Sequence, residues 1–330
     1  MTTSNAWLAC RYPDESSPRF FSCTPSGIPE ANMVWAPFDD ADSAVLHFRI
    51  NAVAESDIPW QHNHNISLDT QTDVPREQYI DMISAARNHI RQTSARKIVV
   101  SRTKSVELDK SFDQQRFFHH LCEAFPGAFV YVFISENACW MGATPELLLD
   151  LKQKQLFTMS LAGTRWNRND ASGWTKKERD EQLWVTTYIR DRLQELGLQN
   201  IEEKGPYNRQ AGHLQHLCTD IQGDVPEDAM PFSLAEKLHP TPAVCGYPTA
   251  AAFDYIRNNE AHNRHYYAGY IGLLESDRAR FFVNLRCMNV FDNRAVLFAG
   301  GGITTDSDPE KEWEETEQKM DVLLRLIQQT

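Results

Sequence analysis

Residues 128–166, AFVYVFISENACWMGATPELLLDLKQKQLFTMSLAGTRW, decide the fold class. Apolar stretches rich in β-branched and aromatic residues follow one another here, separated by short polar stretches, which is the pattern of consecutive β-strands. Strands that succeed one another without an intervening helix favour antiparallel pairing. The segment therefore predicts an antiparallel sheet.

The rest of the chain adds helices between further strands. Apolar residues at helical spacing predict helices at 76–92, 113–125, 176–196, about 253–259 and from about 307 to the C-terminus. Other strands are predicted at 43–53, from position 97 onward, and at 265–276, 279–291 and 294–303. Because strands come in runs and do not alternate strictly with helices, the sequence predicts an α+β fold with antiparallel sheets rather than a doubly wound parallel sheet.

The composition narrows the classes of function. The 330 residues carry a formal net charge of −12, which argues against nucleic acid or an anionic membrane as a partner. The longest apolar run, 128–134, is too short to span a bilayer, and the first residues lack the features of a signal peptide. Seven cysteines without a Cys-x-x-Cys pair fit a reduced, cytoplasmic protein better than a disulfide framework.

The predicted C-terminal helix carries the most informative polar pattern. Ser307 or Asp308 can cap it, and Glu312, Glu315 and Lys319 then share one face that continues into apolar residues. A face that is apolar in its second half points inward, so its first half would aim two carboxylates and an amine at the interior or a cleft. A solvated acidic first turn that complements the helix dipole is an equally open interpretation.

The helix predicted at 176–196 repeats this arrangement. Glu181 begins a face that continues through Val185 and Tyr188. Two inward carboxylates from separate helices suit Mg²⁺, which commonly takes one or two carboxylates together with substrate oxygens and waters. The spacing alone is a weak signal, because surface helices carry many glutamates.

Other candidate functional residues accompany the predicted strands. Gly300–Gly302 stand between a strand and the final helix, where they form either a tight turn or a backbone site for an anion. Arg286 within the apolar strand 279–291 suggests a carboxylate partner, internal or from a ligand. Glu146 at a buried strand end could have a raised pKa and act as a general acid, although such a glutamate is more often structural.

Lys97 stands at the entrance of an apolar strand, directly before Ile98, Val99 and Val100. The ordinary explanation is a strand-edge charge that keeps the sheet soluble. A functional role for this amine needs support from the rest of the sequence.

A series of motifs over residues 76–330 resembles the chorismate-utilising enzymes. The motifs, in the family's order, are KIVVSR, GATPE, LAGTR, KERDEQLWV, LQHL, HPTPAVCGYP, YYAGYIG, NLRCMNV, AGGGI and DSDPEKEWEETEQK. The family includes isochorismate synthase, salicylate synthase and the large subunits of anthranilate and aminodeoxychorismate synthase. The resemblance implies a chorismate-binding catalytic core at 76–330 and a divergent N-terminal part of the same domain at 1–75.

This resemblance implies two packed antiparallel β-sheets with helices on the outside and the active site in the cleft between them. It also implies chorismate as the substrate, with Mg²⁺ holding the ring carboxylate. Glu181 and Glu315 correspond to the metal ligands of the family, and Glu312 to a nearby acid. The implied substrate contacts are Thr164, His216, Tyr267, Arg286, Lys319 and the backbone at Gly300, Gly301 and Gly302.

Lys97 separates members of the family. Relatives that use ammonia commonly carry glutamine at this position, whereas relatives that use water carry lysine. The resemblance therefore favours isochorismate synthase, which adds water at ring carbon 2 and removes the hydroxyl of carbon 4. Lys97 in its uncharged form would be the base and a protonated Glu146 the acid. The product would enter menaquinone or siderophore biosynthesis.

Ala243 is the second discriminating position. Salicylate and anthranilate relatives have threonine there, and alanine resembles isochorismate synthase. Three alternatives stay open: a salicylate synthase, an amine-transferring subunit with a glutaminase partner, and an inactive chorismate-binding subunit. We expect a monomer or weak homodimer that has no obligate glutaminase partner.

Overall fold

The computed structural model describes residues 6–13, 15–60, 73–136, 138–166, 173–211 and 214–330. Its strands are β1 (Ala6–Arg11), β2 (Arg19–Pro25), β3 (Met33–Ala36), β4 (Leu46–Ala52), β5 (Lys97–Glu107), β6 (Phe129–Ser135), β7 (Ala138–Thr144), β8 (Leu147–Lys152), β9 (Gln155–Trp166), β10 (Gln199–Ala211), β11 (Leu214–Asp224), β12 (Gly246–Tyr247), β13 (Tyr270–Leu274), β14 (Arg278–Val283), β15 (Cys287–Val290) and β16 (Arg294–Ile303). Its α-helices are α1 (Arg76–Gln92), α2 (Gln114–Ala124), α3 (Lys176–Glu195), α4 (Pro231–Leu238), α5 (Thr249–Asn259) and α6 (Pro309–Ile327).

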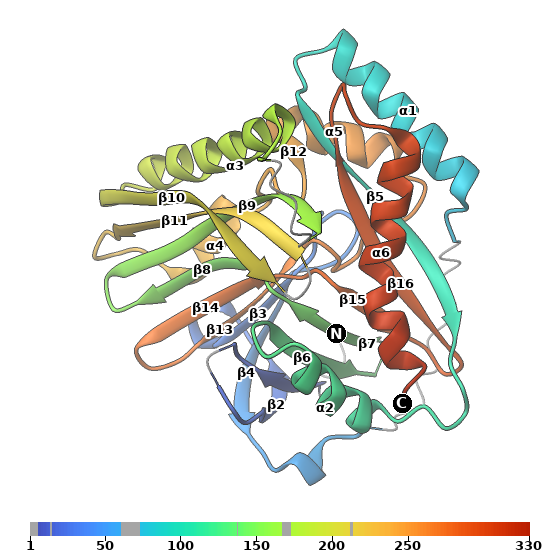
Figure 1. Ribbon diagram of the computed structural model, residues 1–330. Coiled ribbons are helices and arrows are strands. Elements are labelled where there is room, and N and C mark those ends of the chain that lie inside the picture. Colours follow the sequence, from blue (N-terminus) through green and yellow to red (C-terminus); the bar gives the residue numbers. More distant parts are fainter. Residues whose placement is uncertain (1–5, 14, 61–72, 137, 167–172, 212–213) are drawn as a thin grey trace.

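The described strands form one hydrogen-bonded sheet (Figure 1). Their order is β10-β11-β9-β8-β14-β13-β3-β4-β2-β1-β6-β7-β15-β16-β5-β12. Neighbouring strands pair in antiparallel fashion throughout, including β6 with β7 and β8 with β9 within residues 128–166. The predicted α+β class with antiparallel pairing is confirmed.

The long sheet bends so that its two halves pack against each other. The ring of Trp35 on β3 lies 5.6 Å from that of Tyr131 on β6 and 6.5 Å from that of Trp140 on β7. Phe129 on β6 stacks on Phe282 of β14 with ring centroids 4.5 Å apart. These strands are not neighbours in the sheet order, so the contacts join its two halves into one core. The two packed layers implied by the family resemblance are thus two halves of one continuous ladder.

The helices cover the outside of these layers. α6 packs on β16, and α1 packs on α6 and on β5, as the right-hand side of Figure 1 shows. α3 packs on β9, β10 and β11 at the other end of the sheet. The two helices that carry the predicted metal-binding carboxylates therefore belong to different halves of the sheet.

Capping side chains fix where these two helices begin. Asp308 accepts hydrogen bonds from the backbone N–H groups of Glu310 and Lys311 at the start of α6, as the sequence predicts. Thr175 and Glu178 form a capping box at the start of α3. The caps set the rotation of each helix, and hence which of its side chains face the other helix.

One predicted strand is interrupted. Residues 279–291 form parts of β14 and β15 with a break between them, where Asn284 accepts a hydrogen bond from Tyr131 Oη at 2.6 Å and donates one to the carbonyl of Tyr266 at 2.9 Å. Arg286 lies in this break with a φ of 47°. The prediction that Arg286 lies within a strand is therefore wrong. A left-handed backbone is uncommon outside glycine, and strained residues of this kind cluster at functional sites.

The first 75 residues supply strands β1 to β4. β1 pairs with β6 and β3 pairs with β13, so this part continues the sheet formed by the remainder of the chain. The division of the domain at residue 75 stays a prediction. Of the helices among the described residues, none combines the length and the apolar character needed to cross a bilayer.

Candidate active site

Strand β16 presents a backbone edge to the predicted site residues. β5 pairs with β16 along its whole length, whereas β15 pairs with it only at residues 295–297. Among the described residues, no strand therefore covers the second edge of β16 from 298 to 303. Lys319 of α6 donates from Nζ to the carbonyl of Gly300 at 2.7 Å.

The three glycines belong to β16 itself, as the predicted strand 294–303 implies, so their alternative placement between that strand and the final helix is wrong. A Cβ at position 301 would lie 2.8 Å from Glu312 Oε2, and one at position 302 would lie 2.5 Å from Lys97 Cε. Successive residues of a strand face opposite sides. The missing side chains therefore let a carboxylate approach one face of β16 and an amine approach the other.

Lys97 is buried at the first position of β5, with 3% of its surface exposed. Its Nζ lies 3.5 Å from Glu181 Oε2, and its side chain runs against Gly302. A strand-edge lysine that keeps a sheet soluble would be exposed. That ordinary explanation is therefore wrong, and the amine faces the interior.

Six charged side chains form what we call the carboxylate–lysine cluster: Lys97, Lys177, Glu181, Glu312, Glu315 and Lys319. Lys177 Nζ lies 3.1 Å from Glu312 Oε1 and 3.9 Å from Glu181 Oε1. Lys319 Nζ lies 2.8 Å from Glu315 Oε1. The interpretation that α3 and α6 aim carboxylates inward is confirmed for Glu181 and Glu312, which are 8% and 5% exposed, whereas the side chain of Glu315 is 38% exposed.

Lys177 is a member of the cluster that the sequence interpretation missed. It lies four residues before Glu181 on α3, and this spacing was the available signal. The contact with Glu312 of α6 joins residues 135 positions apart, which local spacing does not reveal.

The two acids of α6 differ in their proton affinity. Burial raises the pKa of Glu312, Lys177 opposes this rise, and the neighbouring charge of Glu315 adds to it. Burial also acts to raise the pKa of Glu315, but Lys319 outweighs it, so the pKa of Glu315 is lowered. Glu315 is therefore the more firmly ionised of the two.

Gln182, the residue after Glu181, anchors α3 beside the cluster. Its Nε2 donates to Ser160 Oγ on β9 at 2.7 Å and to Thr219 Oγ1 on β11 at 3.1 Å. Gln182 is 3% exposed. These bonds hold the helix turn that carries Glu181 against the sheet.

His216 and Thr164 are direct cross-strand partners on β11 and β9. The Nδ1 of His216 donates to the carbonyl of Gly163 at 3.2 Å. Burial and the charge of Arg286 lower the pKa of His216 to about 4, so the ring is neutral at pH 7 and its Nε2 carries a lone pair. The charge of Arg286 influences the pKa of His216, so these two predicted site residues lie near each other. The roles of His216 and Thr164 as substrate contacts stay predictions.

Glu146 lies between β7 and β8, where it shares the site with three cations. Burial raises the pKa of Glu146 to about 7, and Lys97, Arg286 and Lys319 oppose the rise. The charge of Lys97 therefore acts on the pKa of Glu146, and the roles of the two residues as base and acid stay predictions. Burial lowers the pKa of Arg286, and Glu146 opposes this shift.

Tyr267 reaches β16 from the segment before β13. Its hydroxyl lies 3.1 Å from where a Cβ on Gly300 would be, and its ring stacks on Phe298 at 5.3 Å. Burial raises the pKa of Tyr267 well above its ordinary value, so the phenol keeps its proton and can donate a hydrogen bond.

Ala243 lies partly buried in the segment between α4 and β12. This segment leads into β12, where Tyr247 pairs with Lys97. Ala243 therefore lies three residues before β12, the strand that pairs with Lys97. Its effect on specificity stays a prediction.

The donor chemistry of the carboxylate–lysine cluster fits a hard divalent cation. Glu181 of α3 and Glu312 of α6 share the ammonium of Lys177, which forms ion pairs with both carboxylates. In the described part of the chain, no three His, Cys, Asp or Glu side chains gather closely enough to hold a metal by themselves. Because Mg²⁺ often takes only one or two carboxylates, the cluster suits an ion shared with a substrate.

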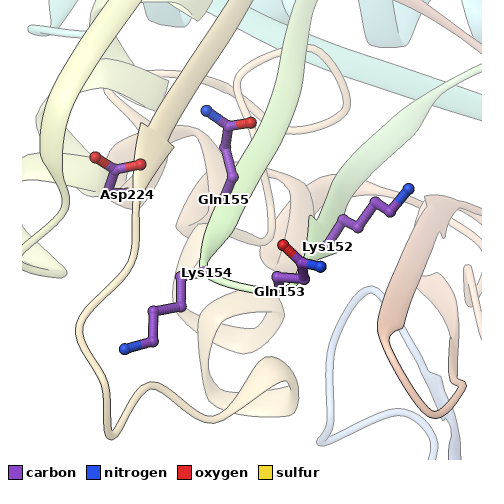
Figure 2. A pocket seen from close by; sticks show the side chains of 5 residues that line it. All are labelled: Lys152, Gln153, Lys154, Gln155 and Asp224. Carbon is purple, nitrogen blue, oxygen red and sulfur yellow. The ribbon is translucent and has the colours of Figure 1, made fainter.

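A surface depression of about 450 Å³ lies elsewhere, at the turn between β8 and β9 (Figure 2). It is lined by Lys152, Gln153, Lys154, Gln155 and Asp224. None of the predicted site residues lines it. Its long side chains point outward from the turn in Figure 2, so it adds nothing to the chemistry of the cluster.

Comparison with known proteins places the chain in a family. The family described as "Chorismate binding enzyme" matches residues 29–328. The "Salicylate biosynthesis isochorismate synthase" of Pseudomonas aeruginosa is 32% identical over 258 residues, which cover 75% of this chain and 54% of that protein. The chain thus spans about half the length of this relative.

Two solved structures share the fold. MenF, the menaquinone-specific isochorismate synthase of Escherichia coli, has a TM-score of 0.76 at 20% identity and covers 98% of this chain and 88% of its own. Anthranilate synthase component I of Streptococcus pneumoniae has a TM-score of 0.72 at 19% identity, with 90% and 81% covered. At these identities the likeness establishes the fold alone. Because the family match covers most of the sequence, the chain belongs to the chorismate-binding enzyme family.

Proposed function

We propose that the protein is an isochorismate synthase, which converts chorismate to isochorismate with Mg²⁺. The observation that carries this proposal is the buried amine of Lys97, 3.5 Å from Glu181, together with its electrostatic influence on Glu146. Glu146 has a pKa raised to about 7 by burial, and Lys97 is among the cations that act on it. An acid and an amine around one site suit a reaction that adds water at one carbon and removes a hydroxyl at another.

In the proposed reaction, Lys97 in its uncharged form takes a proton from water as the water oxygen bonds to ring carbon 2. The ring double bonds shift, and the bond from carbon 4 to its hydroxyl breaks. Glu146 gives its proton to the departing hydroxyl, which leaves as water. One water enters and one leaves, so the atoms balance, and each positioned proton transfer typically contributes about 10²–10⁴-fold to the rate.

The proposed substrate is a dianion, and the site offers it cations and backbone. Arg286 and Lys319 would bind its carboxylate groups, and the glycine edge of β16, which β15 does not cover, would offer backbone groups. Glu181 and Glu315 would hold Mg²⁺ with Glu312 beside them, and the ion would supply positioning and charge stabilisation.

The proposal favours isochorismate synthase over its neighbours in the family. The lysine at position 97 argues against amine transfer and hence against an obligate glutaminase partner, and Ala243 argues against salicylate formation. An inactive chorismate-binding subunit is disfavoured because the chain retains all four proposed catalytic and metal-binding residues, Lys97, Glu146, Glu181 and Glu315. The relatives are named for both menaquinone and salicylate biosynthesis, so menaquinone and siderophore routes are both proposed destinations of the product.

Incubation of the protein with chorismate and Mg²⁺, without ammonia, tests the proposal. We expect isochorismate by chromatography, and we expect a divalent-metal chelator to stop its formation until excess Mg²⁺ is restored. Salicylate with pyruvate would identify a salicylate synthase instead. Binding of chorismate without turnover would identify an inactive subunit, and full activity in chelator would remove the metal from the proposal.

A further inference from the structure

Lys177 connects the two helices that carry the buried carboxylates. Its Nζ lies 3.1 Å from Glu312 Oε1, 3.9 Å from Glu181 Oε1 and 3.3 Å from Ser307 Oγ. The carboxylate side chains are only 6% and 10% exposed. Within the described residues, Lys177 is the cation that forms ion pairs with both of these acids.

The three lysines of the carboxylate–lysine cluster differ in their freedom to move. Lys97 has a side chain 4% exposed and lies tightly against Gly302. Lys319 is 33% exposed, much like Lys177, but it is held at 2.8 Å by Glu315 and at 2.7 Å by the carbonyl of Gly300. Lys177 is 32% exposed and makes longer contacts, all of them to side chains. Its flexible stem can carry the ammonium into water at little cost.

We propose that Lys177 is the resident counter-cation of the metal-free site, and that a divalent cation held by Glu181 and Glu315, with Glu312 beside it, displaces the ammonium of Lys177 from Glu181 and Glu312. This inference rests on the proposed function, because it needs the cluster to bind a metal. Two buried carboxylates facing each other without a cation would repel, so the ammonium keeps the site assembled until the metal arrives.

The charges of the cluster support an exchange rather than joint occupancy. Three glutamates face three lysines, so the cluster is close to neutral without a ligand. A divalent ion added beside the charged Lys177 and Lys319 would leave a buried positive excess even with Lys97 uncharged, which is costly in a poorly solvated site. Departure of Lys177 reduces this excess, and a dianionic substrate offsets the remainder.

Direct titration with Mg²⁺ by isothermal calorimetry tests the exchange without depending on turnover. Lys177→Met removes the competing charge, so we expect it to bind Mg²⁺ at least about ten-fold more tightly than the unmodified protein. Lys176→Met is the matched control. Lys176 is the neighbouring lysine on α3, its side chain is 85% exposed, and it pairs with Asp180 rather than with the cluster. We expect this control to stay within about two-fold, as is usual for exposed pairs.

A second measurement follows the amine itself. If Mg²⁺ displaces Lys177 into water, an amine-acylating reagent should modify Lys177 faster in the presence of Mg²⁺, while Lys176 reacts at the same rate with and without it. Peptide mass spectrometry reads both sites in one sample. Lys177→Gln, which keeps a polar side chain without the charge, should match Lys177→Met in Mg²⁺ affinity if the charge is what competes.

The outcomes separate this inference from the proposed function. Equal or weaker Mg²⁺ binding by Lys177→Met overturns the exchange, even if the protein makes isochorismate. Tighter binding by Lys177→Met supports the exchange, even if chorismate is converted to another product. Absence of Mg²⁺ binding in every variant overturns the exchange together with the metal part of the proposed function.

Discussion

Two groups of buried charge border strand β5, and they differ in how completely they are satisfied. In the first group, Arg264 donates to the two carboxylate oxygens of Glu260 at 2.6 and 2.7 Å, and the backbone N–H of Ser101 donates to the same carboxylate at 2.7 Å. In the second, the carboxylate–lysine cluster, Glu181 is paired at the longer distances of 3.5 and 3.9 Å. The first group is closed by its own hydrogen bonds, whereas the second has acceptor capacity left for a ligand.

The closed group also supports the open one. Arg264 donates to the carbonyls of Val99 on β5 and of Val244 in the segment before β12, at 2.8 and 3.0 Å. It therefore ties the strand that carries Lys97 to the segment beside it. Burial acts to raise the pKa of Glu260, but Arg264 outweighs it, so the pKa is lowered and the pair stays ionised. The Arg264–Glu260 pair, whose hydrogen bonds are satisfied within the fold, thus supports the strand structurally. The carboxylate–lysine cluster, whose hydrogen bonds are not all satisfied, lies at the candidate active site.

The largest effect that would sharpen this comparison is loss of turnover in Lys97→Ala. The substitution removes the proposed base, so we expect turnover to fall by about 10²–10⁴-fold. The circular dichroism spectrum and cooperative unfolding should persist, because Glu181 keeps its contact with Lys177. Steady-state assays of isochorismate formation give the magnitude.

Lys104→Ala is the matched control for this substitution. Lys104 lies on the same strand, its side chain is 34% exposed, and it pairs with Glu317 at 2.8 Å, away from the cluster. Its loss should change turnover by less than about two-fold. Ordinary turnover in Lys97→Ala, or an equal loss in both variants, would contradict the role given to the buried amine.

The next effect is on stability and lies in the closed group. Glu260→Gln leaves the guanidinium of Arg264 buried without its counter-charge, and breaking a buried pair typically costs about 3–5 kcal/mol in the free energy of unfolding. Asp321→Asn is the control, because Asp321 pairs with Arg325 on the surface, where side chains are 45% and 74% exposed. We expect a change of at most about 1 kcal/mol there by urea denaturation. Equal losses in the free energy of unfolding for Glu260→Gln and Asp321→Asn would show that the buried Arg264–Glu260 pair contributes no more to stability than a surface pair.

Much of the fold could be predicted from local patterns. The predicted range 294–303 is β16, and Asp308 caps α6 as expected. The inward face of α6 was also predictable, because helical spacing connects Glu312 and Glu315 with buried Leu323. These features depend on residues within a few turns of one another, and such patterns are visible in a sequence.

The features that escaped prediction depend on contacts between distant segments. Arg286 lies outside a strand because Asn284 is tied to Tyr131, a residue 153 positions away. The role of Gly302 as space for Lys97 follows from the register of β16 against β5, which no local pattern reveals. Lys177 resembles any exposed lysine of an amphipathic helix until α6 is placed beside α3.

The smallest predicted effect on stability tests whether the ionised carboxyl of Glu146 lowers the free energy of unfolding. Burial raises the pKa of Glu146 from 4.5 to about 7, so between these values the folded state binds more protons than the unfolded state. Stability from this group is fully present below about pH 4.5 and is lost as the pH rises through about 7. Glu146→Gln removes this dependence. The variant should therefore gain about 1–3 kcal/mol relative to the unmodified protein between pH 5 and pH 8.

Urea denaturation at both pH values measures this gain, and turnover of the same variant should fall about 10²–10⁴-fold. Glu123→Gln, at an exposed position, is the control and should show no such gain. Opposite signs then separate the two groups of charge: neutralising Glu260 weakens the fold, whereas neutralising Glu146 strengthens it at pH 8 and disables the reaction. If Glu146→Gln changed the free energy of unfolding by the same amount at both pH values, the carboxyl of Glu146 would be hydrogen-bonded within the fold, as that of Glu260 is. It would then not be available as the proposed acid for a substrate.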